Sequence, residues 1–466
     1  MTMEVLADWV SKVSNVVWNG LLLYLLVGTG IVFTIRTRFV QVRKFGAGWK
    51  HLFGHFSLNG EKAGKDGMSP FQALTTAIAA QVGTGNIAGA ATALYSGGPG
   101  AIFWMWLSAF FGMSTIYGEA VLAQKYKTTD DKGHVTGGPI YYIRARFTGK
   151  FGKFLAGFFS VAIIFALGFT GNMVQANSIS VAFNTAFGAP MIVVGIICAI
   201  IAAFIFLGGV GRIAAVTEKV VPIMALFYMG GAVVVLWVHR AALPQAFAQI
   251  CSMAFDMRAG TGGALGYGMM QAVRAGVSRG VFSNEAGLGS SVMVHAAADA
   301  REPCEQGMWA VFEVFFDTIV MCSVTAFVIL TSGVYDVSRY ALASGTPLLS
   351  QLTTGAQLTA EAFSTVFGRF GRGFVAVSLA LFAFSTLLGW SYYGQRAAAY
   401  LMGERVIPVY KAAFLLAAAA GCMMRLEPVW ALSDTFNGLM ALPNLAGVLA
   451  LRRQVIAEWC RYKHDL

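Results

Sequence analysis

Charged residues are scarce in this sequence. Aspartate, glutamate, lysine and arginine make up 12% of the 466 residues, whereas a soluble protein carries about 25%. Hydrophobic residues make up 57%, and they recur in runs of about 20, the length that spans the hydrocarbon core of a bilayer. This composition excludes a soluble globular protein and predicts an all-α protein that crosses a membrane many times.

Motifs of the common enzyme classes are also lacking. The sequence contains no HExxH and no P-loop, the signatures of zinc proteases and nucleotide hydrolases. No segment between the apolar runs is long enough to form a nucleotide-binding domain, so we expect neither an enzyme nor an ATP-driven pump. The six cysteines have no paired spacing such as CxxC, which argues against a metal site and a disulfide framework.

Basic residues outnumber acidic ones by 33 to 22, but they gather in a few segments. Seven lie between the first two apolar runs, seven lie between Lys125 and Lys153, and four lie near the end of the chain. Such clustering is typical of cytoplasmic loops. The net charge of +11 therefore indicates membrane topology, and we expect no nucleic-acid partner.

The apolar runs predict eleven spans. Their limits are 15–35, 69–96, 99–126, 153–185, 189–209, 213–238, 260–284, 307–333, 371–398, 407–424 and 428–451. An odd number of spans, with the basic loops inside, places the N-terminus outside and the C-terminus in the cytoplasm. Within one transmembrane domain (1–466), the span 15–35 stands apart, and the other ten form two sets of five, 69–238 and 260–451. Because five is odd, the second set enters the membrane in the opposite sense from the first.

The second span is interrupted by the stretch QVGTGNIAGA (81–90). Gly83 and Gly85 permit backbone conformations that other residues resist, and Thr84 and Asn86 add side-chain oxygens without adding charge. A helix that breaks here frees backbone N–H and C=O groups within the membrane. The restarting end suits a carboxylate, and the free carbonyls suit a small cation. The alternative is close helix packing, since two of the glycines also form a GxxxG motif.

The seventh span begins with a second glycine-rich stretch, GGALGYG (262–268). Paired interrupted helices at corresponding positions of two halves indicate the substrate site of a transporter. Unwound carbonyls also form the selectivity filters of channels, so a cation channel is an alternative. Such channels usually assemble identical subunits around one pore, whereas this chain has two unlike breaks, and we therefore favour a secondary transporter.

Four stretches resemble a known family. They are QVGTGNIAGAATALYSGGPGAIFWMWLSAFFGMSTIYGEAVLAQKYK (81–127), SRGVFSNEAGLGSS (278–291), GNMVQANS (171–178) and the DT pair at 317–318. Together they are similar to the alanine/glycine:cation symporter family, and the similarity runs over nearly the whole chain. The resemblance implies the LeuT-type fold, five plus five inverted helices, with one extra helix in front. It also implies transport of alanine or glycine, or in some members glutamine, with Na⁺ or sometimes H⁺.

The resemblance implies a Na⁺ site between the first broken helix and the ninth span. Placed in register, the carbonyls of Ala79 and Val82 are the ligands from the first helix. In LALFAFSTLLGW the carbonyl of Phe382 and the hydroxyls of Ser385 and Thr386 are the ligands from the second. Their i, i+3, i+4 spacing puts these three oxygens on one helix face. The alternative is that both hydroxyls bond back to the preceding turn.

The resemblance also implies a substrate site at the breaks. The N–H groups of Thr84 and Gly85, between Gly83 and Asn86, are expected to bind the carboxylate. Gln175, a polar residue within an apolar run, is expected to contact the ligand, or else to join helices as packing glue. The second break is expected to contact the ammonium group; its candidate residues are Gly266, Tyr267, Gly268 and Met269.

Three acidic residues lie in or beside spans, where they are costly and usually functional. Glu119, Asp317 and Glu285 are expected to form an inner gate or an ion-pair network with Arg274 and Arg279. The alternative is that one carboxylate binds H⁺ or a second cation.

The function predicted is uptake of a small neutral amino acid, alanine or glycine and possibly glutamine, together with Na⁺. A proton-coupled symporter is the alternative, followed by the cation channel. The location expected is the bacterial plasma (inner) membrane, with lipid around a monomer or weak oligomer.

Overall fold

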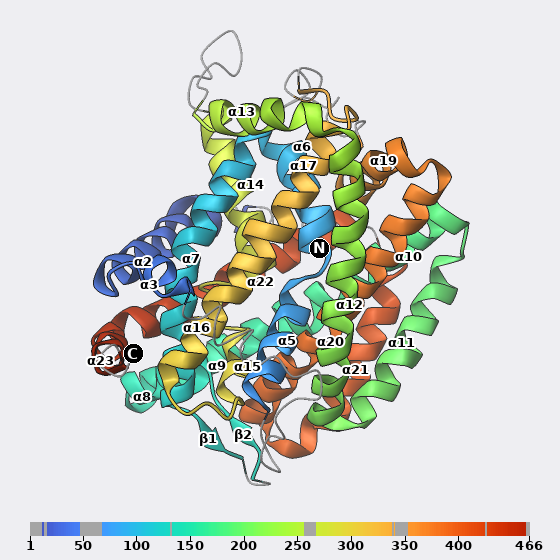
Figure 1. The fold of residues 1–466 in the computed structure, drawn as a ribbon. Helices are drawn as coiled ribbons and strands as arrows, with labels where there is room; N and C mark the ends of the chain where they lie inside the picture. The colour runs from blue at the N-terminus through green and yellow to red at the C-terminus, as the bar shows by residue number, and fades with distance from the viewer. Residues whose placement is uncertain are drawn as a thin grey trace.

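The computed structural model describes residues 12–13, 16–46, 68–130, 133–255, 267–337, 340, 353–424 and 426–462. The described part is a bundle of helices, with one two-stranded antiparallel ribbon at one end (Figure 1). The ribbon pairs β1 (Thr128–Thr129) with β2 (Val135–Thr136). We call this the β-ribbon end of the bundle, and the opposite end, which carries α13, the α13 end.

The first half of the chain supplies the following helices. They are η1 (Val17–Leu22), α2 (Leu23–Arg36), α3 (Val40–Arg43), α5 (Pro70–Gln81), η2 (Gly85–Gly89), α6 (Ala90–Gly97), α7 (Gly100–Lys125), α8 (Pro139–Arg146), α9 (Gly149–Ile163), η3 (Ile164–Gly171), α10 (Asn172–Phe187), α11 (Met191–Leu207), α12 (Gly209–Val238), η4 (Arg240–Ala242) and α13 (Leu243–Met253). The η1, η2 and η3 segments are π-helical turns, which occur mostly as bulges in α-helices and often at functional sites.

The second half of the chain begins with α14. Its helices are α14 (Tyr267–Asn284), α15 (Val292–Ala296), α16 (Pro303–Val314), η5 (Phe315–Cys322), α17 (Ser323–Thr331), α19 (Gly355–Phe367), α20 (Arg369–Met402), η7 (Glu404–Val406), α21 (Ile407–Gly421), α22 (Leu426–Ala450) and α23 (Arg452–Tyr462). The η5 segment is again π-helical, and it joins α16 to α17 in one continuous helix. The boundaries of the two predicted sets of five, 69–238 and 260–451, stay predictions.

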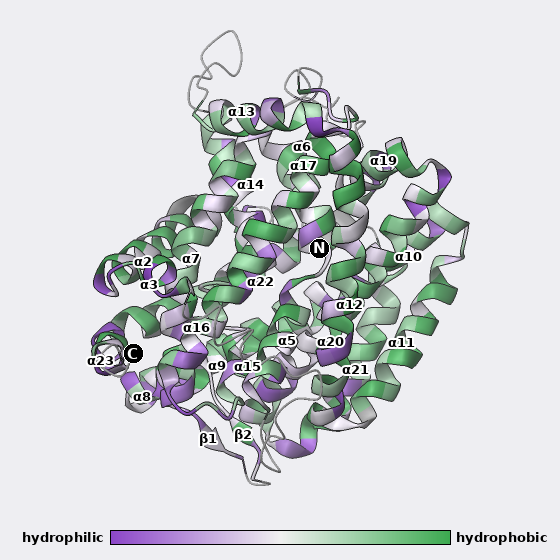
Figure 2. Ribbon diagram, in the orientation of Figure 1, coloured by the Kyte–Doolittle hydropathy of each residue, from purple (hydrophilic) through white to green (hydrophobic). Residues whose placement is uncertain are grey.

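The outer surface of the bundle is apolar between its two ends. Five helical segments are long and apolar enough to cross a membrane: Gly100–Lys125, Gly149–Phe187, Gly209–Val238, Pro303–Thr331 and Arg369–Met402. Large apolar side chains such as Ile200, Phe204 and Leu226 point outward from α11 and α12. In Figure 2, hydrophobic residues cover these helices, and hydrophilic residues gather around the β-ribbon end. Exposed apolar side chains on this scale fit contact with lipid.

The first interrupted helix begins at a strong start signal. Ser69 and Gln72 form a capping box, and Pro70 occupies the first helical position of α5, where its missing N–H costs nothing. The helix then runs from the β-ribbon end to its break at Val82. Its start is held by a bridge between Met68 and Ala298, in which the Met68 N–H donates to the Ala297 carbonyl at 3.0 Å.

The structure describes only the end of the glycine-rich stretch 262–268, where the sequence predicts the second interruption. Residues 262–266 lie outside the described residues, and α14 is continuous from Tyr267 to Asn284. The helix stops at 285–291, before α15, where Gly287 and Gly289 have φ of +89° and +79°. Glycine reaches this left-handed region readily because it has no Cβ. Tyr267 and Gly268 are therefore not part of a break, and the rest of the predicted stretch stays a prediction.

Candidate functional site

The first break is closed by the side chain of Asn86. The Val82 N–H still donates to the Ile78 carbonyl at 2.7 Å, but ψ of 88° at Val82 turns the chain out of the helix. The Asn86 Oδ1 accepts the Gly83 N–H at 2.9 Å. This side chain therefore satisfies an N–H group that the break would otherwise leave unpaired in a buried place.

A buried carboxylate holds the other end of Asn86. Asp317, in η5, has no exposed surface, and its Oδ1 accepts the Asn86 Nδ2 at 2.7 Å and the Ser283 hydroxyl at 3.0 Å. Its Oδ2 accepts the Thr318 hydroxyl at 2.8 Å. Three neutral donors thus hold Asp317 between the first break and the end of α14.

The predicted Na⁺ ligands are close together. The Ser385 hydroxyl lies 3.2 Å from the Ala79 carbonyl and 2.8 Å from the Phe382 carbonyl. The Thr386 hydroxyl lies 3.0 Å from the first and 3.1 Å from the second. All four residues are fully buried. The hydroxyls therefore reach across to α5 as well as back along α20, and the alternative of local back-bonding alone does not describe them.

Val82, the fifth predicted ligand, stands at the end of α5 directly before Gly83. Gly83 itself lies against the Thr386 hydroxyl. Carbonyls and hydroxyls around an unwound helix are the ligands that transporters use for Na⁺. The geometry suits a small cation, and its binding stays a prediction.

The predicted substrate residues of the first break also meet Gln175. The Gln175 Oε1 accepts the Thr84 N–H at 3.1 Å, and both side chains are buried. The Thr84 hydroxyl is buried without a hydrogen-bond partner, which is costly unless a ligand supplies one. Gly83, Thr84, Gly85, Asn86 and Gln175 therefore form one cluster, as the sequence predicts.

Gly85 packs directly on the end of α14. A Cβ at Gly85 would lie 2.9 Å from the Ser283 hydroxyl, and a Cβ at Gly97 would lie 2.8 Å from Ala275. The helices α6 and α14 are thus antiparallel, and the carboxyl end of α14 faces the amino end of η2. Ser283 was not among the predicted site residues, although it lies in the quoted stretch 278–291.

The candidates from the glycine-rich stretch are not part of this cluster. Tyr267, Gly268 and Met269 form the first turn of α14, on the far side of Ala272, which already packs against the last residue of α6. They lie about 20 Å along the helix from Ser283, at 1.5 Å per residue. Gly266 lies outside the described residues.

The acidic residues are held mainly by neutral groups. Glu285 accepts the Ser290 hydroxyl at 2.5 Å and the Trp390 indole N–H at 2.6 Å. Glu119 accepts the Gly287 N–H at 3.1 Å and an N–H of Asn444.

The predicted ion pair of these acids with Arg279 is wrong. Arg279 lies one turn before Ser283 on α14 and pairs with Asp434 of α22, where it also lies 4.9 Å from the Trp430 ring centre. The Arg279 guanidinium therefore forms its ion pair at the α14–α22 contact, not with the acids at the break.

The fold is that of a known class of secondary transporters. A crystal structure of the manganese transporter of Eremococcus coleocola is similar to the chain, with a TM-score of 0.51 and 14% sequence identity, covering 79% of this chain and 74% of that one. The predicted fold class, a LeuT-type helical bundle, is confirmed. The count of eleven spans stays a prediction.

Sequence similarity then gives the family. The sodium:alanine symporter family matches residues 3–466. The sodium/alanine symporter AgcS of Methanococcus maripaludis is 43% identical, covering 97% of this chain and 96% of that protein. The probable sodium/glutamine symporter GlnT of Bacillus subtilis is 38% identical, covering 97% and 90%. The chain belongs to the sodium:alanine symporter family, and it is a multi-pass membrane transporter coupled to Na⁺, not an enzyme.

Gly83→Ala should damage the Na⁺ site. The added Cβ would collide with the Thr386 hydroxyl and lie 3.2 Å from the Gln175 Oε1. Overpacking of this kind costs about 1–3 kcal/mol, or about 5- to 150-fold in a binding constant. We expect the Na⁺ concentration for half-maximal uptake to rise by a factor in that range, measured in proteoliposomes.

Gly89→Ala is the matched control for that variant. Its Cβ would meet only the Thr84 carbonyl, at 3.9 Å, so normal Na⁺ dependence is expected. An unchanged Na⁺ dependence in Gly83→Ala would contradict the position of the cation site.

Proposed function

We propose that the chain carries alanine or glycine together with Na⁺ into the cell, and that both bind at the first break. The observation that supports this most directly is the convergence of the Ala79 and Phe382 carbonyls with the Ser385 and Thr386 hydroxyls beside the break. Na⁺ binds among these four oxygens, and the Val82 carbonyl is its fifth ligand.

The substrate binds between two helix ends of opposite polarity. The amino end of η2, at Thr84 and Gly85, carries a partial positive charge and binds the carboxylate. The carboxyl end of α14 at Ser283 carries a partial negative charge and faces the ammonium group. The unpartnered Thr84 hydroxyl and Gln175 bond to the carboxylate side.

A small substrate suits this site because the two helix ends lie close together. Gly85 and Ser283 are so close that a Cβ added at Gly85 would lie 2.9 Å from the Ser283 hydroxyl, so a ligand between these ends must be small. Glycine and alanine are therefore the favoured substrates. Glutamine is the larger candidate to test beside them, because the relative GlnT is described as a probable sodium/glutamine symporter. One methylene changes binding by about 1–3 kcal/mol, so competition experiments resolve these candidates.

The β-ribbon end is the cytoplasmic end of the bundle. The segment with β1, β2 and α8 lies at that end (Figure 1) and carries basic residues such as Lys127 and Arg144, as the positive-inside rule requires of a cytoplasmic loop. With eleven spans, the N-terminus is then outside and the C-terminus inside, in a bacterial inner membrane.

Proton-coupled symport is the second candidate. The buried carboxylates of Glu119, Glu285 and Asp317 support it, because buried acids in membrane proteins commonly form proton relays. A cation channel has no comparable support, since the site is closed between two unlike helices of one chain.

Radiolabelled alanine uptake into proteoliposomes tests these proposals. Uptake is measured first under a Na⁺ gradient and then under a pH gradient alone. Unlabelled glycine, glutamine, serine and D-alanine serve as competitors. We expect saturable uptake that follows Na⁺ and is inhibited most by glycine among the competitors. Uptake driven only by the pH gradient would support the second candidate, and no saturable uptake under either gradient would overturn both.

A further inference from the structure

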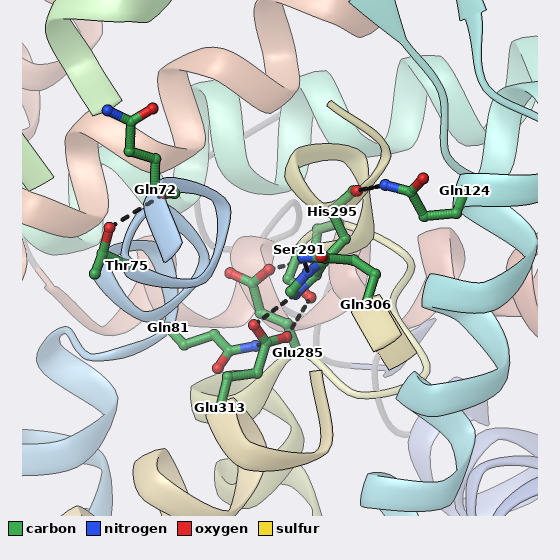
Figure 3. A network of polar contacts seen from close by, with 10 residues as sticks. Gln72, Thr75, Gln81, Gln124, Glu285, Ser291, His295, Gln306 and Glu313 are labelled. Atoms are coloured by element: carbon green, nitrogen blue, oxygen red, sulfur yellow. Dashed lines mark hydrogen bonds and ion pairs between the residues drawn. The ribbon is translucent and has the colours of Figure 1, made fainter. Parts of the chain in front are cut away.

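A fully buried histidine–glutamate pair lies between the two helix interruptions. The His295 Nε2, on α15, is 2.7 Å from the Glu313 Oε2, on α16, and neither side chain is exposed. The Glu313 Oε1 accepts the Gln81 Nε2 at 3.0 Å and the Ser291 hydroxyl at 3.1 Å. Figure 3 shows these side chains converging on Glu313. The pair therefore joins the last residue of α5 to the last residue of the second interruption.

The second imidazole nitrogen of His295, Nδ1, contacts the side-chain amide of Gln306. The Gln306 Nε2 lies 2.6 Å from the His295 Nδ1, and the Gln306 Oε1 is buried without a partner. If the amide donates, Nδ1 carries no proton and the neutral imidazole donates through Nε2 to Glu313. If the amide turns over, its Oε1 accepts an Nδ1–H, and the imidazole is a cation. In both arrangements each ring nitrogen has a hydrogen-bond partner. A group that gains and loses a proton needs this property.

We propose that His295 and Glu313 form a proton-binding site of the transporter. A hydronium ion gives one proton to the bare His295 Nδ1: its O–H bond breaks, an N–H bond forms and water is left. The Gln306 amide rotates, so that its Oε1 accepts this N–H in place of the earlier contact through Nε2. The proton goes to the imidazole because the Glu313 carboxylate already accepts three hydrogen bonds, whereas the partner of the His295 Nδ1 can turn over. The proposal rests on the proposed function, since the proton is a further ligand of the same carrier.

The surroundings of the pair are rich in acids. The groups that carry or can carry a charge around Glu313 are Glu119 of α7, Glu285, Asp317 of η5 and Tyr393 of α20. On the side of α7, Gln124 bonds the His295 carbonyl at 2.5 Å and accepts from Lys127 at 2.9 Å. The protonated pair is neutral as a whole, whereas the unprotonated pair adds a buried negative charge among these acids.

The site is placed to act on opening of the β-ribbon end. Gln81 belongs to α5, whose start is held to Ala298 by the Met68 bridge. Any movement of α5 away from α15 and α16 breaks the bond between Gln81 and Glu313 and admits water to the pair. Proton binding therefore stabilises the closed β-ribbon end, and opening this end favours release of the proton to that side.

Solid-state NMR of the full chain in lipid, labelled with ¹⁵N-histidine, tests the site without transport. The His295 signals are those lost in His295→Gln. At alkaline pH we expect a bare Nδ1 and a protonated Nε2, and at acidic pH two protonated nitrogens. One unchanged tautomer between about pH 5 and 8, the range in which histidine normally titrates, would overturn the proposal.

Na⁺-driven alanine uptake across the same pH range tests its role. We expect an inflection in the wild type that disappears in His295→Gln while Na⁺-driven uptake persists, and that stays in the control His239→Gln, at the α13 end. Gln306→Leu removes the acceptor of the Nδ1–H, so the inflection should move about one unit to lower pH. The same inflection in wild type, His295→Gln and Gln306→Leu would overturn the proposal.

The two readouts keep the two proposals separate. No Na⁺-driven uptake by the wild type at any pH would reject the proposed function, and the NMR titration would still decide the proton site. If His295→Gln fails to fold, the NMR titration of Gln306→Leu is compared with that of the wild type. Identical titrations in the two proteins would overturn the proposal.

Discussion

Thr386→Ala should weaken Na⁺ binding by about 10- to 100-fold. The substitution removes one of two hydroxyls that lie beside the Ala79 and Phe382 carbonyls. An oxygen that contacts a buried charge contributes about 1.5–3 kcal/mol, and each 1.4 kcal/mol is tenfold in affinity. The measurement is the Na⁺ concentration that gives half-maximal alanine uptake in proteoliposomes.

Two variants of the same helix provide the controls. Thr386→Ser keeps the hydroxyl and should stay close to wild type. Ser378→Ala removes a buried hydroxyl that bonds only back to Phe374, at 2.8 Å, so its Na⁺ dependence should not change. Normal Na⁺ dependence in Thr386→Ala would place the cation elsewhere, and an equal loss in Ser378→Ala would indicate general damage to α20.

The first break and the helix face shared by Phe382, Ser385 and Thr386 could be predicted from the sequence because their signals are local. Two glycines with Thr84 and Asn86 in an apolar run interrupt a helix wherever the rest of the chain lies. The spacing of Phe382, Ser385 and Thr386 fixes their common helix face. Only the contact of Ser385 and Thr386 with Ala79 required the family resemblance, because these residues are separated from Ala79 by 306 and 307 positions in the sequence.

Glycine content alone does not locate an interruption: of the predicted second break, 262–266 lies outside the described residues, and Tyr267 and Gly268 are helical. The stretch 262–268 has more glycines, but α14 breaks at 285–291, where Gly287 and Gly289 take left-handed conformations and Glu285 also has a positive φ of 56°. Hydropathy shows that the apolar run ends near 284. It does not show whether the chain then leaves the bundle or turns inside it, because buried hydrogen-bond partners decide that.

The sequence predicts a network of Glu119, Asp317 and Glu285 but not Glu313 or the neutral partners of these acids, although part of the signal is visible. Glu313 and Asp317 lie four residues apart in one apolar run, and residues at that spacing share a helix face. Their partners could not be found in the same way. Gln81 is 232 positions from Glu313 and Asn86 is 231 from Asp317, so only the packed bundle brings these side chains together.

Asn86→Asp should abolish uptake at neutral pH. The substitution replaces the donor that lies 2.7 Å from Asp317 with a second carboxylate, inside a fully buried site. Leaving a buried charge unpaired costs about 3–5 kcal/mol, so we expect a loss of about 100-fold or more in the initial rate. The Gly83 N–H keeps an acceptor, so the backbone contact at the break survives.

Acid should partly restore Asn86→Asp. Lower pH protonates one of the two carboxyl groups, which removes the repulsion between them, and the shared proton provides the donor that the amide supplied. Uptake by the variant should therefore rise as the pH falls, relative to wild type at the same pH. Asn86→Ala, which loses the same hydrogen bonds without adding charge, should be inactive at every pH and is the matched control.

The double variant Asn86→Asp with Asp317→Asn separates charge repulsion from loss of a special side chain. The exchanged pair keeps one amide and one carboxylate. The new amide nitrogen replaces Asp317 Oδ1 and donates across the contact, the amide oxygen still accepts from Thr318, and the Ser283 hydroxyl turns to accept from the amide. If the contact works as a hydrogen-bonded pair, the double variant should recover much of the activity at neutral pH that Asn86→Asp loses, a coupling that a double-mutant cycle measures directly. If the exchange recovers nothing, the carboxylate is needed at position 317 itself, where it would then act on the ammonium group or on a cation, not only on Asn86.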